Sequence, residues 1–118
     1  RAVREFLDRH QISRDGLVST DGSGLSRQDL VTPRTLAGVL RTMAFHRERG
    51  PFWDALPVAG VDGTLRTRMV GSAANQRVRA KTGYLSGRTA LSGYVTTKGG
   101  DLLIAVTVFN RFSGTTRE

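Results

Sequence analysis

The sequence contains no cysteine, only three prolines and only two histidines. The absence of cysteine excludes disulfides and cysteine-ligated zinc, but it leaves the redox compartment open, because both cytosolic and exported proteins can lack cysteine. No apolar run approaches the roughly 18 residues that a membrane-spanning helix needs, so no membrane span is expected.

Lysine is also scarce, although basic residues are not. Of the eighteen lysine and arginine residues, only Lys81 and Lys98 are lysines. Lys98 lies in a glycine-rich stretch that predicts an exposed turn, whereas Lys81 lies in a predicted strand. An ammonium group can change its pKa on burial and take part in proton transfer, while a guanidinium stays charged. Lys81 is therefore a candidate functional residue.

The net charge of +8 favours negatively charged partners such as nucleic acid or an anionic polymer. However, the arginines are scattered along the chain, and no stretch of five to eight residues is dominated by basic residues. This distribution favours an ordinary solvated surface, and we expect no nucleic-acid partner. A noncatalytic basic module that binds nucleic acid or an anionic cell-wall polymer remains the alternative interpretation.

The chain of 118 residues has room for one domain or part of one. Thr32 and Pro33 predict the start of a helix, as N-cap and first helical residue, and Gly50 and Pro51 predict its end. The apolar spacing predicts helical segments at residues 1–12, 33–49, 52–56 and 65–70. Their lengths suggest two substantial helices and two short ones.

The second half of the sequence changes character and predicts strands. We expect strands at residues 17–20, 78–84, 89–97 and 102–109, with a hairpin turn at 97–101. The last strand is almost continuously apolar, which is typical of a strand buried on both faces. The fold class is therefore α+β. Because three strands with two longer helices leave much of a sheet uncovered, we expect further elements of the same domain before residue 1 or after residue 118.

Three glycine-containing segments occur in a set order. They are DGSGLSR at 21–27, LPVAGVDGTL at 56–65 and AKTGYLSG at 80–87. In this order the sequence resembles the D-alanyl-D-alanine carboxypeptidase/endopeptidase family, the class C low-molecular-mass penicillin-binding proteins of peptidase S13 type. The resemblance extends from the first helix to Phe109. It implies a serine β-lactamase/DD-peptidase fold, an antiparallel sheet flanked by helices, of which residues 1–118 form a C-terminal part that is incomplete at both ends.

The resemblance also implies a reaction. Enzymes of this family cleave the D-Ala-D-Ala bond of peptidoglycan stem peptides through a serine ester, without a metal or cofactor, and β-lactam antibiotics acylate the same serine. Lys81 would supply positive potential for the terminal carboxylate of the substrate and for proton relay. The hydroxyl of Thr82 would hydrogen-bond the same region, and the backbone N–H of Tyr84 would form half of an oxyanion hole.

Three further residues are implied to bind substrate. Gly83 has no side chain, so the substrate backbone can approach the strand and pair with it. Leu85 follows on the same strand. Arg27 would grip a free carboxylate of the stem peptide in a bidentate manner.

Two other family motifs are missing from the sequence. A Ser-x-x-Lys motif would need serine three residues before a lysine, where Val78 and Val95 stand. A Ser-x-Asn motif would need serine two residues before an asparagine, where Ala73 and Val108 stand. We therefore expect a serine-type D-Ala-D-Ala carboxypeptidase in a parent protein whose N-terminal part supplies the nucleophile, and no activity from this chain alone.

Two further expectations concern cellular location and assembly with a second chain. The resemblance implies a periplasmic or extracytoplasmic location, although residues 1–5 show no signal-peptide pattern. A half-length protein that completes its site with a second chain is another possibility. Ser23 and His46 do not fit a hydrolase triad, and His10 and His46 fit helix ends better than metal ligands.

Overall fold

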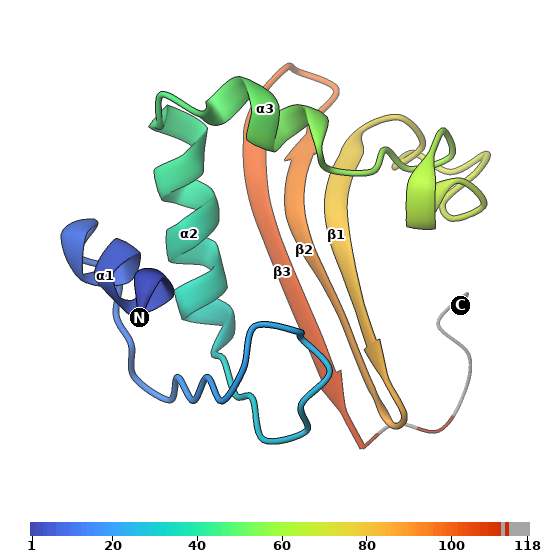
Figure 1. The fold of residues 1–118 in the computed structure, drawn as a ribbon. Helices are drawn as coiled ribbons and strands as arrows, with labels where there is room; N and C mark the ends of the chain where they lie inside the picture. The colour runs from blue at the N-terminus through green and yellow to red at the C-terminus, as the bar shows by residue number, and fades with distance from the viewer. Residues whose placement is uncertain (112, 114–118) are drawn as a thin grey trace.

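The computed structural model describes residues 1–111 and 113. A three-stranded sheet lies beside α2, and α3 crosses over one end of the strands (Figure 1). The elements are α1 (Ala2–Arg9), α2 (Pro33–Phe45), α3 (Arg49–Asp54), the short 3-10 helix η1 (Gly63–Leu65), β1 (Val78–Leu85), β2 (Arg88–Thr96) and β3 (Leu102–Asn110). This α+β arrangement is the predicted fold class. In the part of the chain that the structure describes, no helix has the length and apolar character to cross a membrane.

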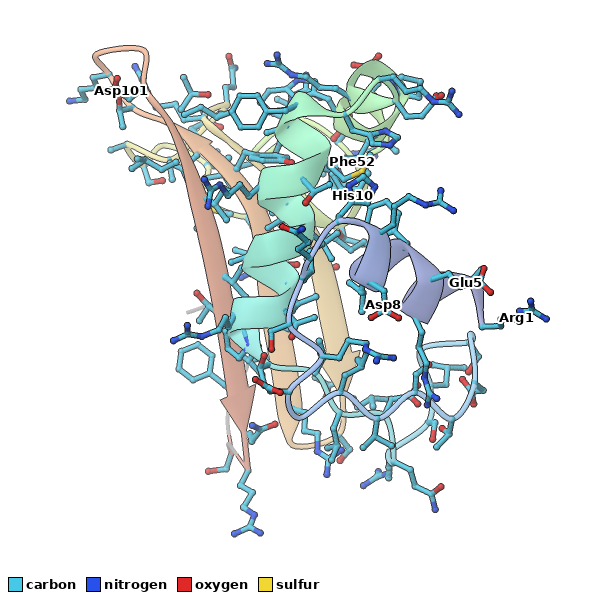
Figure 2. The ribbon with its side chains drawn as sticks, turned by 90° about the vertical axis from the view of Figure 1, so that its left-hand side faces the viewer. Arg1, Glu5, Asp8, His10, Phe52 and Asp101 are labelled. Atoms are coloured by element: carbon cyan, nitrogen blue, oxygen red, sulfur yellow. The ribbon has the colours of Figure 1, made fainter. Side chains whose placement is uncertain are left out.

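The sheet is an antiparallel meander in the order β1-β2-β3. All three strands agree with the sequence prediction to within one residue. The predicted hairpin turn joins β2 and β3, where the N–H of Thr97 donates to the carbonyl of Asp101 at 2.8 Å. Asp101 lies at this hairpin, at one end of the sheet, whereas Glu5 on α1 and Arg1 just before α1 lie away from the sheet (Figure 2).

The start of α2 was predicted correctly, but its end was not. The side-chain oxygen of Thr32 accepts a hydrogen bond from the N–H of Thr35, as expected of an N-cap. The helix ends at Phe45 rather than near residue 49, because His46 adopts an extended conformation. Pro51 does not stop a helix; it lies in the first turn of α3, where its missing N–H is not needed.

Three other local predictions need correction. The helix expected at residues 1–12 ends at Arg9, with Gln11 in the left-handed region at φ 55°. The strand expected at 17–20 is a single bridge between Val18 and Leu30. The helix expected at 65–70 is replaced by η1, which ends at Leu65. Each of these segments is short, and local preference alone is a weak determinant of structure over so few residues.

The core lies on both faces of β1 and β2. On the face toward α2, Tyr94 is buried against Leu40 and Leu56, and its hydroxyl donates to the carbonyl of Leu40 at 2.6 Å. Burial raises the pKa of Tyr94 above its ordinary value. On the other face, Leu65 and Ala80 belong to a separate buried cluster formed by β1 and the loops before it.

The strand β3 is not buried on both faces, contrary to the prediction. Leu103 is 52% exposed and Phe109 is 57% exposed. β3 has only β2 as a neighbour, so it forms an edge of the sheet. Only Val106 of β3 joins the cluster beneath α2, and the second buried cluster draws its strand residues from β1 and β2. The apolar sequence of β3 therefore lies largely open.

Candidate functional site

The Lys-Thr-Gly sequence lies on β1, the opposite edge strand of the sheet. The hydrogen bonds around β1 define which backbone groups face outward. Arg77 accepts from the N–H of Thr96 at 2.8 Å, so odd-numbered residues pair with β2. The N–H of Ala80 donates outward to the carbonyl of Pro57 at 3.0 Å, so the backbone N–H and carbonyl groups of even-numbered residues face away from β2.

Residues 57–59 pair with only the first part of this outward edge. The N–H of Ala59 donates to the carbonyl of Val78 at 2.9 Å, and the pairing ends at Ala80. By the two-residue period of a strand, the backbone groups of Thr82 and Tyr84 face outward on the same side. Among the described residues, no backbone hydrogen bond to these two N–H groups is found on that side. We call this outward stretch of Thr82 to Tyr84 the open edge.

The side chains along the open edge leave room for a ligand backbone. The Lys81 side chain is exposed and its ammonium group donates to the carbonyl of Thr82 at 2.5 Å. A side chain at Gly83 would meet only Cβ of Ala90, at 3.5 Å. Tyr84 is 70% exposed and Leu85 is half-buried. The five predicted residues of β1 are therefore consecutive on one edge strand, with Lys81, Gly83 and Tyr84 exposed and Thr82 and Leu85 partly buried.

Arg27 reaches this region through the turn between β1 and β2. A guanidinium nitrogen of Arg88 donates to the backbone carbonyl of Arg27 at 3.1 Å. Arg88 pairs with Leu85 at the end of the β1–β2 hairpin. The loop that carries Arg27 is thus attached to the end of β1 that lies beyond Tyr84.

The loop before Arg27 is held by its own polar groups. The carboxylate of Asp29 accepts hydrogen bonds from both the N–H and the hydroxyl of Thr20, each at 2.7 Å. These two bonds lower the pKa of Asp29 below its ordinary value. Asp21 accepts from the N–H of Ser23 at 2.8 Å, which makes a local turn. These contacts indicate a loop-fixing role for the acidic and hydroxyl residues of this segment.

The histidines lie at helix ends, as predicted. His10 and His46 are the C-terminal caps of α1 and α2, and their rings are 5.7 Å apart. Among the described residues, no group of three or more histidine or acidic side chains could hold a metal ion. His46 accepts a hydrogen bond from the N–H of Glu48, consistent with a structural role.

Sequence reasoning missed two residues that contact the predicted site. The hydroxyl of Thr82 donates to the hydroxyl of Thr64, 18 residues earlier, at 2.9 Å. The second is Arg88, which holds Arg27. Thr64 lies within the glycine-containing segment 56–65, so the family resemblance could have pointed to it as a residue near the site. Arg88 gave no such signal, because it is one of many scattered arginines.

A family model described as the D-Ala-D-Ala carboxypeptidase 3 (S13) family matches residues 1–118. The chain belongs to this family. The S13 assignment agrees with the order of the three glycine-containing segments, whereas the basic-module alternative rested on net charge alone.

Two curated relatives are D-alanyl-D-alanine carboxypeptidases. One, from an Actinomadura strain, is 46% identical in an alignment of length 118 that covers 95% of this chain and 22% of the relative. The other, DacB of Haemophilus influenzae, is 35% identical over 114 residues, which cover 95% of this chain and 24% of the relative. The S13 chain thus spans about a quarter of the length of these relatives.

A solved structure of penicillin binding protein 4 (dacB) from Haemophilus influenzae matches the fold with a TM-score of 0.88. It is 34% identical, and the match covers 99% of this chain and 26% of that one. A second structure of the same protein, which matches equally well, contains a bound β-lactam. The α+β fold with an antiparallel sheet and flanking helices is therefore shared with an S13 relative.

Proposed function

We propose that this chain forms one wall of the active site of a serine-type D-Ala-D-Ala carboxypeptidase or endopeptidase that acts on peptidoglycan stem peptides. The observation that carries the proposal is the open edge, where the outward N–H groups of Thr82 and Tyr84 have no backbone partner among the described residues and lie beside the exposed Lys81. S13 membership and the carboxypeptidase names of two relatives support this assignment. An extracytoplasmic location follows from the proposed substrate.

The open edge suits an extended peptide. A stem peptide lying along Thr82 to Tyr84 adds a strand to the sheet, and main-chain hydrogen bonds hold it in register. The N–H of Tyr84 then donates to the oxygen of the scissile carbonyl, where negative charge develops as a nucleophile attacks. Lys81 supplies the positive charge that attracts the terminal carboxylate of the substrate. Gly83 allows the peptide backbone to approach.

Further contacts hold the rest of the stem peptide. Arg27 binds a free carboxylate beyond the far end of the open edge, in the region of Leu85, because Arg88 anchors its loop there. The same site accepts a β-lactam, as does the relative with a bound β-lactam. This chain lacks the Ser-x-x-Lys and Ser-x-Asn motifs, so the nucleophilic serine comes from another part of the full-length protein. Residues 1–118 are then one part of the domain, and the exposed face of β3 is where another part packs.

The test is labelling of the full-length protein with a fluorescent penicillin. Lys81→Ala should slow acylation by about 10- to 100-fold, because a charge-assisted contact to the carboxylate is worth roughly 1.5–3 kcal/mol. Lys98→Ala is the matched control: it removes the other lysine, which lies in the exposed β2–β3 hairpin, and should leave acylation unchanged. A protein that is not labelled with Lys81 intact, or equal labelling of the two variants, would refute the proposal.

A further inference from the structure

The hydrogen bond between Thr82 and Thr64 has a direction that matters for ligand binding. Thr82 donates and Thr64 accepts, with 2.9 Å between the two hydroxyl oxygens. A hydroxyl group has one hydrogen to donate and two lone pairs to accept with. The hydrogen of Thr82 is therefore engaged. Among the described residues, no acceptor is found for the hydroxyl hydrogen of Thr64.

The loop that presents Thr64 is fixed on both sides of it. The carboxylate of Asp62 accepts a hydrogen bond from the N–H of Val58 at 2.7 Å. Leu65 is completely buried, and its carbonyl accepts from the N–H of Gly60 at 2.9 Å. Thr64 thus lies between two anchored residues, so its hydroxyl has a defined place opposite Thr82.

The conformation of this loop favours glycine at position 63. Gly63 has φ of 50°, and a side chain there would come within 3.0 Å of Cγ of Pro57. Pro57 in turn accepts the last hydrogen bond of the paired part of β1, from Ala80. The loop therefore ends the backbone pairing at Ala80 and places Thr64 where the open edge begins.

We propose that Thr64 is a positioning residue that reverses its hydrogen bond to Thr82 when a ligand carboxylate binds. This inference rests on the proposed function, and it takes from the family resemblance that the hydroxyl of Thr82 hydrogen-bonds the terminal carboxylate of the substrate beside Lys81. A carboxylate can only accept hydrogen bonds, so Thr82 must turn its hydrogen from Thr64 to the ligand. Thr64 then turns its own free hydrogen to the oxygen of Thr82.

The reversal needs two hydroxyl rotations and no proton transfer. One hydrogen bond in the free protein becomes two in the complex, in a chain from Thr64 through Thr82 to the carboxylate. Each bond in such a chain polarises the next, so the contact to the carboxylate is strengthened. Thr64 never touches the substrate, and its effect depends on the ligand having a carboxylate.

The experiment uses the full-length protein and two peptide substrates, one ending in D-Ala-D-Ala with a free carboxylate and the other with that carboxylate amidated. Thr64→Val keeps the shape of the side chain and removes the hydroxyl. We expect kcat/KM for the carboxylate substrate to fall roughly two- to tenfold, the effect of one hydrogen bond, and that for the amide to stay nearly unchanged. Thr64→Ser should restore the wild-type preference.

Two further variants complete the design. Thr67→Val is the matched control, because Thr67 is an exposed threonine of the same region and no side-chain hydrogen bond to it is found among the described residues. Thr64→Ala repeats the test if valine lowers the unfolding temperature. An equal loss on both substrates would indicate a purely structural role and overturn the inference.

Thr82→Val separates this inference from the function on which it rests. If Thr82→Val lowers the preference for the carboxylate substrate over the amide and Thr64→Val does not, the proposed reversal of the Thr64–Thr82 hydrogen bond is wrong and the proposed function stands. If Thr82→Val leaves the preference unchanged, the proposed role of Thr82 is wrong and the reversal is overturned with it.

Discussion

The two edges of the sheet are both open, but their side chains differ. The open edge of β1 is short and carries a threonine, a glycine and an exposed tyrosine, with Lys81 beside it. The edge formed by β3 is long and apolar, with Leu102, Leu103 and Ile104 each at least 37% exposed. Among the described residues, β3 pairs only with β2, whereas the outer side of β1 is paired with residues 57–59 as far as Ala80 and is open beyond it.

The difference indicates two kinds of occupant. An exposed apolar strand edge is a pairing and aggregation hazard, which proteins usually cover permanently. A short edge without aliphatic side chains can take up and release a peptide, because main-chain hydrogen bonds supply affinity without a large apolar surface. We therefore assign the transient ligand to β1 and permanent packing to β3.

The largest effect on stability is expected at one of two glycines in the sheet, Gly93 in β2 and Gly83 in β1. A side chain at Gly93, in the central strand, would overlap the carbonyl oxygen of Arg79 and come within 2.7 Å of Cβ of Ala80. Gly93→Ala should therefore lower the free energy of unfolding of the full-length protein by about 3 kcal/mol or more, measured by urea denaturation.

The matched variant is Gly83→Ala on the open edge. It has only an ordinary contact to make within the protein, at 3.5 Å, so stability should change by less than about 0.5 kcal/mol. Penicillin acylation should nevertheless fall, because the added methyl group blocks the approach of the ligand backbone. Equal acylation of Gly83→Ala and wild type would remove the case for a peptide at this edge.

A substitution on β3 tests the permanent partner. If another part of the full-length protein covers this strand, Leu103→Ser should lower the free energy of unfolding by about 2 kcal/mol, the loss for a buried leucine. Leu25→Ser is the control, since Leu25 is a leucine in an exposed loop, 71% exposed. A change within about 0.5 kcal/mol for both variants would mean that the β3 face is open to solvent.

The smallest effect concerns the loop beside the open edge. The lowered pKa of Asp29 means that the folded loop favours the ionised carboxylate. Its stabilisation is present above the ordinary pKa of aspartate, about 4, and is lost as the pH falls through the lowered value. The urea midpoints of wild type and Asp29→Asn should differ at pH 7, and the difference should shrink as the pH falls below the ordinary aspartate pKa of about 4. A constant difference would mean that the charge of Asp29 plays no part.

Much of the β-rich half could be read from the sequence. The strands of the meander have strong local signals: alternation, β-branched residues and a glycine turn between β2 and β3. Thr32 and Pro33 likewise mark the start of α2 by chemistry that acts within one helical turn. The Lys-Thr-Gly segment lies on the predicted strand, β1.

The failures share a physical cause. Local periodicity overestimates the extent of each element: α2 ends at Phe45, Val18 makes a single bridge with Leu30, and η1 ends at Leu65. The exposure of β3 could not be read from its composition, because an apolar strand has the same sequence whether its cover is present or absent.

The sequence alone determined the family, the three strands and the identity of the Lys-Thr-Gly segment, because order and spacing of short motifs are linear properties. Only the tertiary structure decided which side of β1 is open, since that depends on where residues 57–59 pair. It also decided that Thr64 meets Thr82 and that Arg88 holds Arg27, because these contacts join segments that are distant along the chain.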